Sequence, residues 1–121
     1  MRRSSLLHLA LGALFAVLAA SCLSPTLPLP PPEPDSIQEA RTGVWIVSGS
    51  CQKGATITVT NTSRHRGVVV EDFQQIGNYS IEIEADLCDT GSVSEQIGNE
   101  VSDETSFVFD KPSGSSSSSC H

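Results

Sequence analysis

Apolar and polar residues alternate along the middle of this chain with the period of two that is typical of β-strands. Residues 55–60 show it best, because alanine, isoleucine and valine take turns with threonine there. Residues 78–85 repeat the pattern, with Tyr79, Ile81 and Ile83 among the residues expected to face a core. Further strands are predicted at 44–47, 67–70, 92–97 and 105–109. Short strands separated by turns with Gly, Asn and Asp predict an all-β fold, a small antiparallel sandwich.

The predicted strand at residues 92–97 carries fewer apolar residues than the others. Val93 and Ile97 are the expected apolar anchors of residues 92–97. In the final strand, Phe107 and Phe109 should share one face, and the valine between them should point to the other.

Residues 1–21 have the composition of an export signal that is cleaved off. Arg2 and Arg3 provide a positive start, an almost wholly apolar run covers residues 6–18, and small residues follow. The apolar run is shorter than the roughly 20 residues that a membrane-spanning helix needs. We therefore expect an exported protein whose mature chain begins at Cys22.

The sequence Leu18-Ala19-Ala20-Ser21-Cys22 resembles the lipobox of bacterial lipoproteins. In that family the cysteine thiol receives a diacylglyceryl group before cleavage on its N-terminal side, so the resemblance implies lipidation at Cys22 and a lipid anchor in the membrane. A residue other than aspartate after the cysteine, here Leu23, implies the outer membrane of a bacterial cell envelope.

An alternative is that Cys22 is an ordinary cysteine beyond the cleavage site of a soluble secreted protein. The chain has four cysteines. Without acylation they could form two bridges, Cys51 with Cys88 and Cys22 with Cys120, whereas acylation of Cys22 leaves an odd number. The number of cysteines therefore favours the soluble form and the lipobox favours the anchor.

Composition divides the rest of the chain. Six prolines between residues 25 and 34 predict an extended spacer, and residues 22–42 are assigned to a lipidated N-terminus and proline-rich linker in a coil conformation. Residues 43–110 hold the predicted strands and form one domain. Residues 111–121 are assigned to a disordered, serine-rich tail.

The predicted domain also resembles bacterial immunoglobulin-like (Ig-like) surface modules. The residues that carry the likeness are Val47-Ser48-Gly49-Ser50-Cys51-Gln52-Lys53-Gly54-Ala55-Thr56-Ile57-Thr58-Val59, Gly77-Asn78-Tyr79-Ser80-Ile81 and Gln96-Ile97-Gly98-Asn99-Glu100-Val101-Ser102. The resemblance implies an Ig-like β-sandwich that serves adhesion or structural support. In such a topology the turns that hold Cys51 and Cys88 fall at the same pole, so a disulfide between them is expected, which would stabilise so small a domain.

Charge and motifs exclude several classes of function. Loss of Arg2 and Arg3 with the signal makes the formal net charge −9, because five basic residues then face fourteen acids. Such a balance argues against nucleic-acid binding. No motif for catalysis, a cofactor or a metal is found: His65 has no predictable nucleophile nearby, and Asp86, Asp89 and the acids of residues 99–104 lack the spacing of a calcium loop.

We therefore expect a non-catalytic cell-envelope lipoprotein that displays an Ig-like module for binding, adhesion or structural support. Its expected partners are the membrane, through the lipid anchor, and a protein or cell-surface glycan. The alternative is a soluble secreted binding factor, or an accessory subunit or inhibitor of an exported enzyme, that uses the basic residues 64–66.

Overall fold

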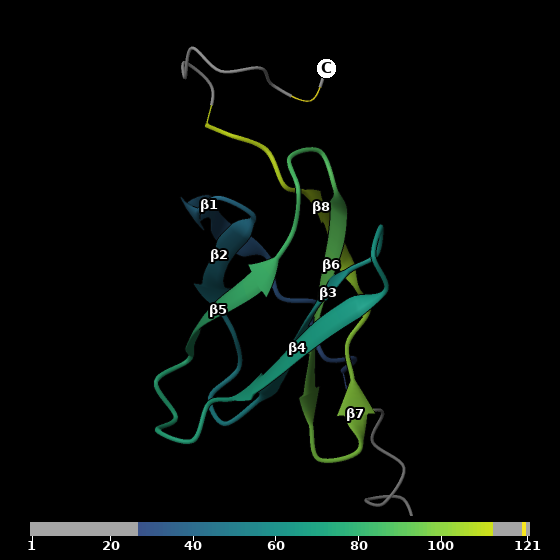
Figure 1. Cartoon of the computed structure of the whole chain (residues 1–121). Coiled ribbons are helices and arrows are strands. Elements are labelled where there is room, and N and C mark those ends of the chain that lie inside the picture. The colour runs from purple at the N-terminus through teal and green to yellow at the C-terminus, as the bar shows by residue number, and fades with distance from the viewer. Residues whose placement is uncertain (1–26, 113–119, 121) are drawn as a thin grey trace, which may run out of the picture.

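Two antiparallel sheets make up residues 27–112 and Cys120, the part of the chain that the computed structural model describes. The strands are β1 (Pro34–Arg41), β2 (Val44–Ser50), β3 (Thr56–Asn61), β4 (Arg66–Glu71), β5 (Asn78–Glu84), β6 (Thr90–Ile97), β7 (Glu100–Val101) and β8 (Thr105–Val108). One sheet has the order β1-β2-β5, and the other has the order β4-β3-β6-β7, with β8 also paired to β6. Figure 1 shows the two groups of strands on opposite sides of the molecule. The described residues contain no helix, so the predicted all-β sandwich is confirmed.

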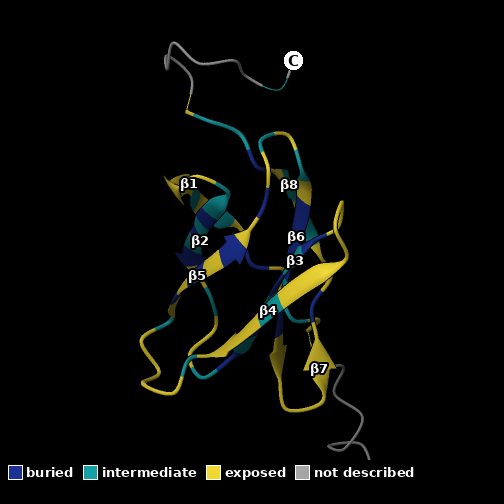
Figure 2. Ribbon diagram, viewed as in Figure 1, coloured by how far each residue is buried: buried dark blue, intermediate teal, exposed yellow. Residues whose placement is uncertain are grey.

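The core lies between the sheets and follows the alternation of the sequence. Every second residue of β2, β3 and β5 is buried, while the residues between them are partly or fully exposed. Figure 2 shows these buried positions inside the sandwich, whereas β4 is exposed along almost its whole length. The threonines of β3 lie on its outer side, where their hydroxyl groups reach water and their branched side chains suit a strand.

An aromatic cluster fills one end of the core. Trp45 and Phe109 are fully buried and meet edge to face with their ring centroids 5.7 Å apart, and Phe107 packs on Phe109 at 5.1 Å. The indole nitrogen of Trp45 donates a hydrogen bond to the carbonyl oxygen of Ala85 at 3.1 Å, so its polar atom is satisfied inside the core. This cluster links β2 of one sheet to the residue that follows β8 of the other.

Strand β1 corrects the expectation that residues 22–42 are a coil linker. Residues 34–41 pair with β2 along its length, and Ile37, opposite Val47, packs against the core. The strand is at the edge of its sheet and begins with Pro34, where a missing backbone donor is tolerated. Because Ile37 is one of its few apolar residues and most of the strand is exposed, no alternating pattern reveals it in the sequence.

Strand β6 also differs from its prediction at one end. Val93 is buried as expected, but Ile97 is 39 % exposed, and the inward position between them belongs to Glu95. The register explains this, because Glu95 lies opposite Ile57 and Val93 opposite Val59, both core residues. Beyond Glu95 the strand extends past the core into a short hairpin with β7, which the sequence pattern also missed.

The disulfide differs from the predicted one. The structure joins Cys88 to Cys120, with their Cα atoms 5.3 Å apart, and Cys51 has no disulfide partner among the described residues. Cys51 lies beside Gly77, just before β5 begins, whereas Cys88 follows the other end of β5. Seven residues of strand span roughly 20 Å, and a disulfide needs Cα atoms within about 7 Å. The predicted Cys51–Cys88 pairing is therefore wrong, because these cysteines lie at opposite poles of the sandwich.

Candidate functional site

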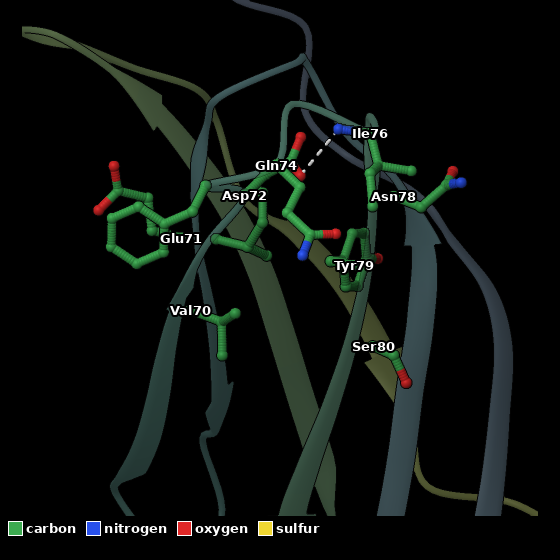
Figure 3. Close-up of a pocket in the computed structure, with 10 residues that line it drawn as sticks. Val70, Glu71, Asp72, Gln74, Ile76, Asn78, Tyr79 and Ser80 are labelled. Carbon is green, nitrogen blue, oxygen red and sulfur yellow. Dashed lines mark hydrogen bonds between the residues drawn. The ribbon is translucent and has the colours of Figure 1, made fainter.

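A groove opens where β4 and β5 face each other, each at the free edge of its own sheet. In many Ig-like sandwiches an additional strand would extend the sheet beside β5. Here β4 pairs with β3 instead, in the other sheet, so both edges stay uncovered within the described residues. The groove has a volume of about 300 Å³ and is lined by Ile57, Val70, Glu71, Asp72, Phe73, Gln74, Ile76, Asn78, Tyr79 and Ser80 (Figure 3).

The loop that closes one end of the groove, residues 72–77, is held in shape by Asp72. One oxygen of its carboxylate accepts hydrogen bonds from the backbone N–H groups of Gly54 and Gly77, at 3.1 and 2.9 Å. The other accepts one from Ile76 at 3.0 Å, drawn as a dashed line in Figure 3. Gly77 has a φ of +85°, which disfavours a side chain there.

These hydrogen bonds make the charged form of Asp72 the favourable one. The bond from Gly77 is the largest cause that lowers the pKa of Asp72 below its ordinary value of 3.8. A lowered pKa in the folded state stabilises the loop at pH values above about 4, and this contribution is lost as the pH falls through the lowered pKa. At neutral pH the loop is therefore fixed around a carboxylate.

Large apolar side chains surround the groove without being covered. Phe73 is 81 % exposed and Ile76 is 58 % exposed, and both belong to the loop fixed by Asp72. Val70 points into the groove from β4, since it lies opposite the core residue Ile57, and Val69 is exposed on the other face of that strand. An exposed apolar patch beside a hollow is characteristic of a site that contacts another molecule.

The edge of β4 offers hydrogen-bonding groups next to this patch. Residues 67–70 read Gly-Val-Val-Val, and the strand is flanked by a charged residue at each end, Arg66 and Glu71. The backbone N–H and C=O groups on the free side of an edge strand can pair with a further strand. The groove thus combines apolar contacts with a row of backbone donors and acceptors.

Ion pairs link β4 and the turn before it to β5 and the segment after it, at the ends of the two strands away from the groove. Arg66 of β4 contacts Glu84 of β5, with Nη1 and Oε2 2.8 Å apart. Arg64 contacts Asp86, and its Nε lies 3.2 Å from Oδ2 of Asp89. Such exposed pairs contribute at most about 1 kcal/mol each, so they direct the geometry more than they stabilise the fold.

A buried asparagine organises the same end. Asn61 is fully buried, and its Nδ2 donates hydrogen bonds to the carbonyl oxygen of Glu84 at 3.1 Å and to Oδ2 of Asp89 at 2.9 Å. The hydrogen bond from Asn61 is the largest cause that lowers the pKa of Asp89. Asn61 also begins the sequence Asn61-Thr62-Ser63, which matches the acceptor pattern for N-glycosylation, and its side chain is already hydrogen-bonded within the fold.

The structure separates most of the residues that the sequence singled out. The arginines of the basic tip, residues 64–66, are paired with acids of their own chain. Asp86 and Asp89 follow β5, whereas Asn99 and Glu100 lie at the opposite end of β6, and the described part of the chain holds no cluster of three or more metal-ligating side chains. Residues 1–21, Cys22 and the serine-rich stretch 113–119 fall outside the described residues.

Sequence reasoning missed the groove itself. Phe73 and Ile76 lie between two predicted strands, in a segment without strand periodicity. One signal in the sequence could have pointed to Phe73 and Ile76. They are two large apolar residues in a turn that an aspartate and a glycine flank, and residues of such a turn are expected to be exposed. Which edges are free depends on the sheet that β4 joins, and the alternation pattern does not specify that.

The fold and the groove define the class of protein, a small all-β domain consistent with an Ig-like fold that carries an uncovered apolar groove. No protein-family profile matches the sequence, and searches of curated proteins and of solved structures gave no match. Within residues 27–112, no helix has the length and apolar character to span a bilayer.

Proposed function

We propose that this protein is a non-catalytic binding module of the bacterial cell envelope, exported and lipid-anchored through Cys22, that holds an extended segment of another protein in its groove. The observation that carries the proposal is the set of exposed apolar side chains beside the free edge of β4. Phe73 and Ile76 are exposed from a loop that Asp72 keeps rigid, so their exposure does not depend on disorder.

Strand addition is the mode of binding that suits this arrangement. A segment laid along β4 would form backbone hydrogen bonds with the free edge, and every second side chain would reach the apolar wall that Val70 and Ile76 provide. An apolar wall favours a protein segment over a glycan, which binds mainly through hydroxyl groups. The basic tip, residues 64–66, is less suited to binding because its arginines would have to leave their own ion pairs.

The disulfide supports the anchored form over the soluble alternative. When Cys88 and Cys120 pair with each other, Cys120 is not available to pair with Cys22. The remaining cysteine of the domain, Cys51, is partly buried, and desolvation is the largest cause that raises the pKa of its thiol. Partial burial limits the access of a second thiol to Cys51, which favours acylation as the role of Cys22.

Replacing Cys22 by Ser should release the protein from the membrane fraction, because a serine cannot receive the thioether-linked lipid that holds the chain at the bilayer. Fractionation of cells that express the variant and the original protein measures this. Cys51→Ser is the matched control and should stay with the membrane. A Cys22→Ser protein that remains in the membrane fraction would contradict the lipid anchor.

The groove is tested by a separate experiment, photo-crosslinking from position 73.

A further inference from the structure

A second hollow, separate from the groove, lies on the face of β6 and β8 that points away from the core. We call it the hydroxyl pocket and define it by six residues of its lining, Thr62, Thr90, Ser92, Glu104, Ser106 and Val108. Its volume is about 330 Å³, within the range of roughly 300–1,000 Å³ that is usual for small-ligand sites. Four of these six residues carry a hydroxyl group, one is acidic, and none is basic.

Strand register explains why these side chains share one face. Ser92 of β6 lies opposite Ser106 of β8, and the next outward pair of residues is Thr90 with Val108. Val93 follows Ser92 and is buried in the core, so the side chain of Ser92 points outward. Serine is smaller than the threonine and valine side chains beside it, which leaves the sheet surface hollowed at Ser92.

Ser92 is the unusual member of the hydroxyl pocket. Only 4 % of its surface is exposed, yet its hydroxyl group makes no hydrogen bond with any described residue. Polar groups at such depth normally have a partner, either from the protein or from an ordered molecule beside it. Its oxygen is not sealed off, because Ser92 lines the hollow. The hydroxyl group therefore offers a donor and an acceptor to a molecule in the pocket.

The threonine hydroxyl groups at one end of the pocket are held in place. Oγ1 of Thr62 and Oγ1 of Thr90 are 2.7 Å apart, and Oγ of Ser63 is 3.1 Å from Oγ1 of Thr90. The backbone N–H of Thr90 also donates a hydrogen bond to Oγ of Ser63, at 3.0 Å. Groups whose positions are set before binding lose little conformational entropy when a ligand arrives.

The strands that carry the hydroxyl pocket present no charge to the outside, although the chain has 14 acidic residues. β3, β6 and β8 contain one charged residue, Glu95, which is buried on the core side. The outward face of β5, in contrast, carries Glu82 and Glu84. Glu104 stands just before β8, so an anionic group in the pocket would meet a carboxylate and no cation. The pocket therefore suits an uncharged ligand.

We propose that the hydroxyl pocket binds a sugar ring of an uncharged glycan. Each hydroxyl group of a sugar is both donor and acceptor, so it matches the hydroxyl groups of Ser92 and Ser106. The carboxylate of Glu104 accepts a hydrogen bond from a further sugar hydroxyl. Val108 is 43 % exposed and offers an apolar surface to the C–H groups of the ring. This site lies apart from the groove and does not depend on the function proposed for it.

A protein segment is less suited to this pocket than a sugar. Strand addition needs a free sheet edge, whereas β6 is paired with β3 on one side and with β8 on the other. Protein partners also bind mainly through large apolar side chains at the centre of an interface. The hydroxyl pocket has Val108 as its one apolar side chain among the six residues that define it.

The test follows backbone amide signals of the full-length protein by nuclear magnetic resonance, in a detergent that has no sugar headgroup. The probes are the uncharged trisaccharides cellotriose, maltotriose and triacetylchitotriose. At least one of them should shift the signals of Thr90, Ser92 and Ser106 in a saturable way. Ser92→Ala should weaken that binding roughly 2- to 12-fold, the loss expected for one hydrogen bond. Ser92→Val fills the pocket and should abolish binding.

Thr58→Val is the matched control, because it removes a hydroxyl group from the same sheet face outside the pocket. It should leave trisaccharide binding unchanged, and dispersed amide signals verify that each variant is folded. Ser92→Ala introduces no larger side chain, so it keeps the test decisive if Ser92→Val fails to fold.

The absence of a saturable shift with all of these trisaccharides would overturn the proposal. Equal binding by the original protein and by both Ser92 variants would also overturn it. A hexapeptide of alternating valine and threonine is the probe for a protein ligand. Pocket signals that shift with this peptide and with no trisaccharide would assign the pocket to a protein segment and reject the glycan.

Discussion

Replacing Cys88 and Cys120 by Ser together should lower the free energy of unfolding by roughly 4 kcal/mol, the chain-entropy value for a closed loop of this size. The two cysteines are 32 residues apart in the sequence, and the bond ties the C-terminal segment to the end of the core. Cys88 N–H donates to the carbonyl oxygen of Phe109 at 2.8 Å, so the constraint acts where the aromatic cluster ends. Urea unfolding of the variant and the original protein measures the difference.

The free thiol supplies the control for the disulfide. Cys51→Ser removes a cysteine that has no partner in the described structure, and it should change the unfolding free energy by less than about 1 kcal/mol. Peptide mapping without reduction should recover residues 88 and 120 in one linked fragment. A fragment that links residues 51 and 88 instead would contradict the pairing, and a double variant as stable as the original would contradict its contribution.

Phe109→Ala should destabilise the domain by about 3–5 kcal/mol, the range for removing a large aromatic side chain from a packed core. Phe109 is fully buried between Trp45 and Phe107, so the substitution leaves a cavity where the two sheets meet. A loss of this size is comparable with the whole stability of many small domains. Trp45 is the chain's single tryptophan, and its fluorescence reports unfolding directly.

The neighbouring residue is the matched control for this substitution. Val108 is 43 % exposed and points to the opposite face of its strand, so Val108→Ala should cost less than about 1 kcal/mol. Circular dichroism alongside the fluorescence separates global unfolding from a local change around Trp45. Equal effects of the two substitutions would show that Phe109 is not a core residue.

The sequence predicted those parts of the fold in which local pattern and burial agree. Strands β3 and β5 alternate strictly and were found at nearly their observed bounds. β1 was missed because an edge strand needs few apolar residues, and Ile37 alone carries its contact with the core. Alternation puts Glu95 on the same face as Val93, and its burial was not anticipated because a carboxylate at an inward position departs from the hydrophobic pattern.

Features that depend on distant parts of the chain were beyond the sequence pattern. The resemblance to Ig-like modules predicts a disulfide between Cys51 and Cys88 because it puts their turns at one pole, whereas the length of β5 places them at opposite poles. The candidate groove requires that β4 pair with β3 and not with β5. The sequence pattern does not distinguish between these two pairings.

Photo-crosslinking in cells tests the proposed binding groove most directly. A benzophenone side chain placed at position 73 should form a defined adduct with a protein partner, because Phe73 is at the exposed apolar end of the groove. The same group at position 101, on the exposed strand β7 at a different edge, is the control and should form none. Ile76→Asp in the first protein should abolish its adduct. Equal adducts from both positions, or none from position 73, would contradict the account.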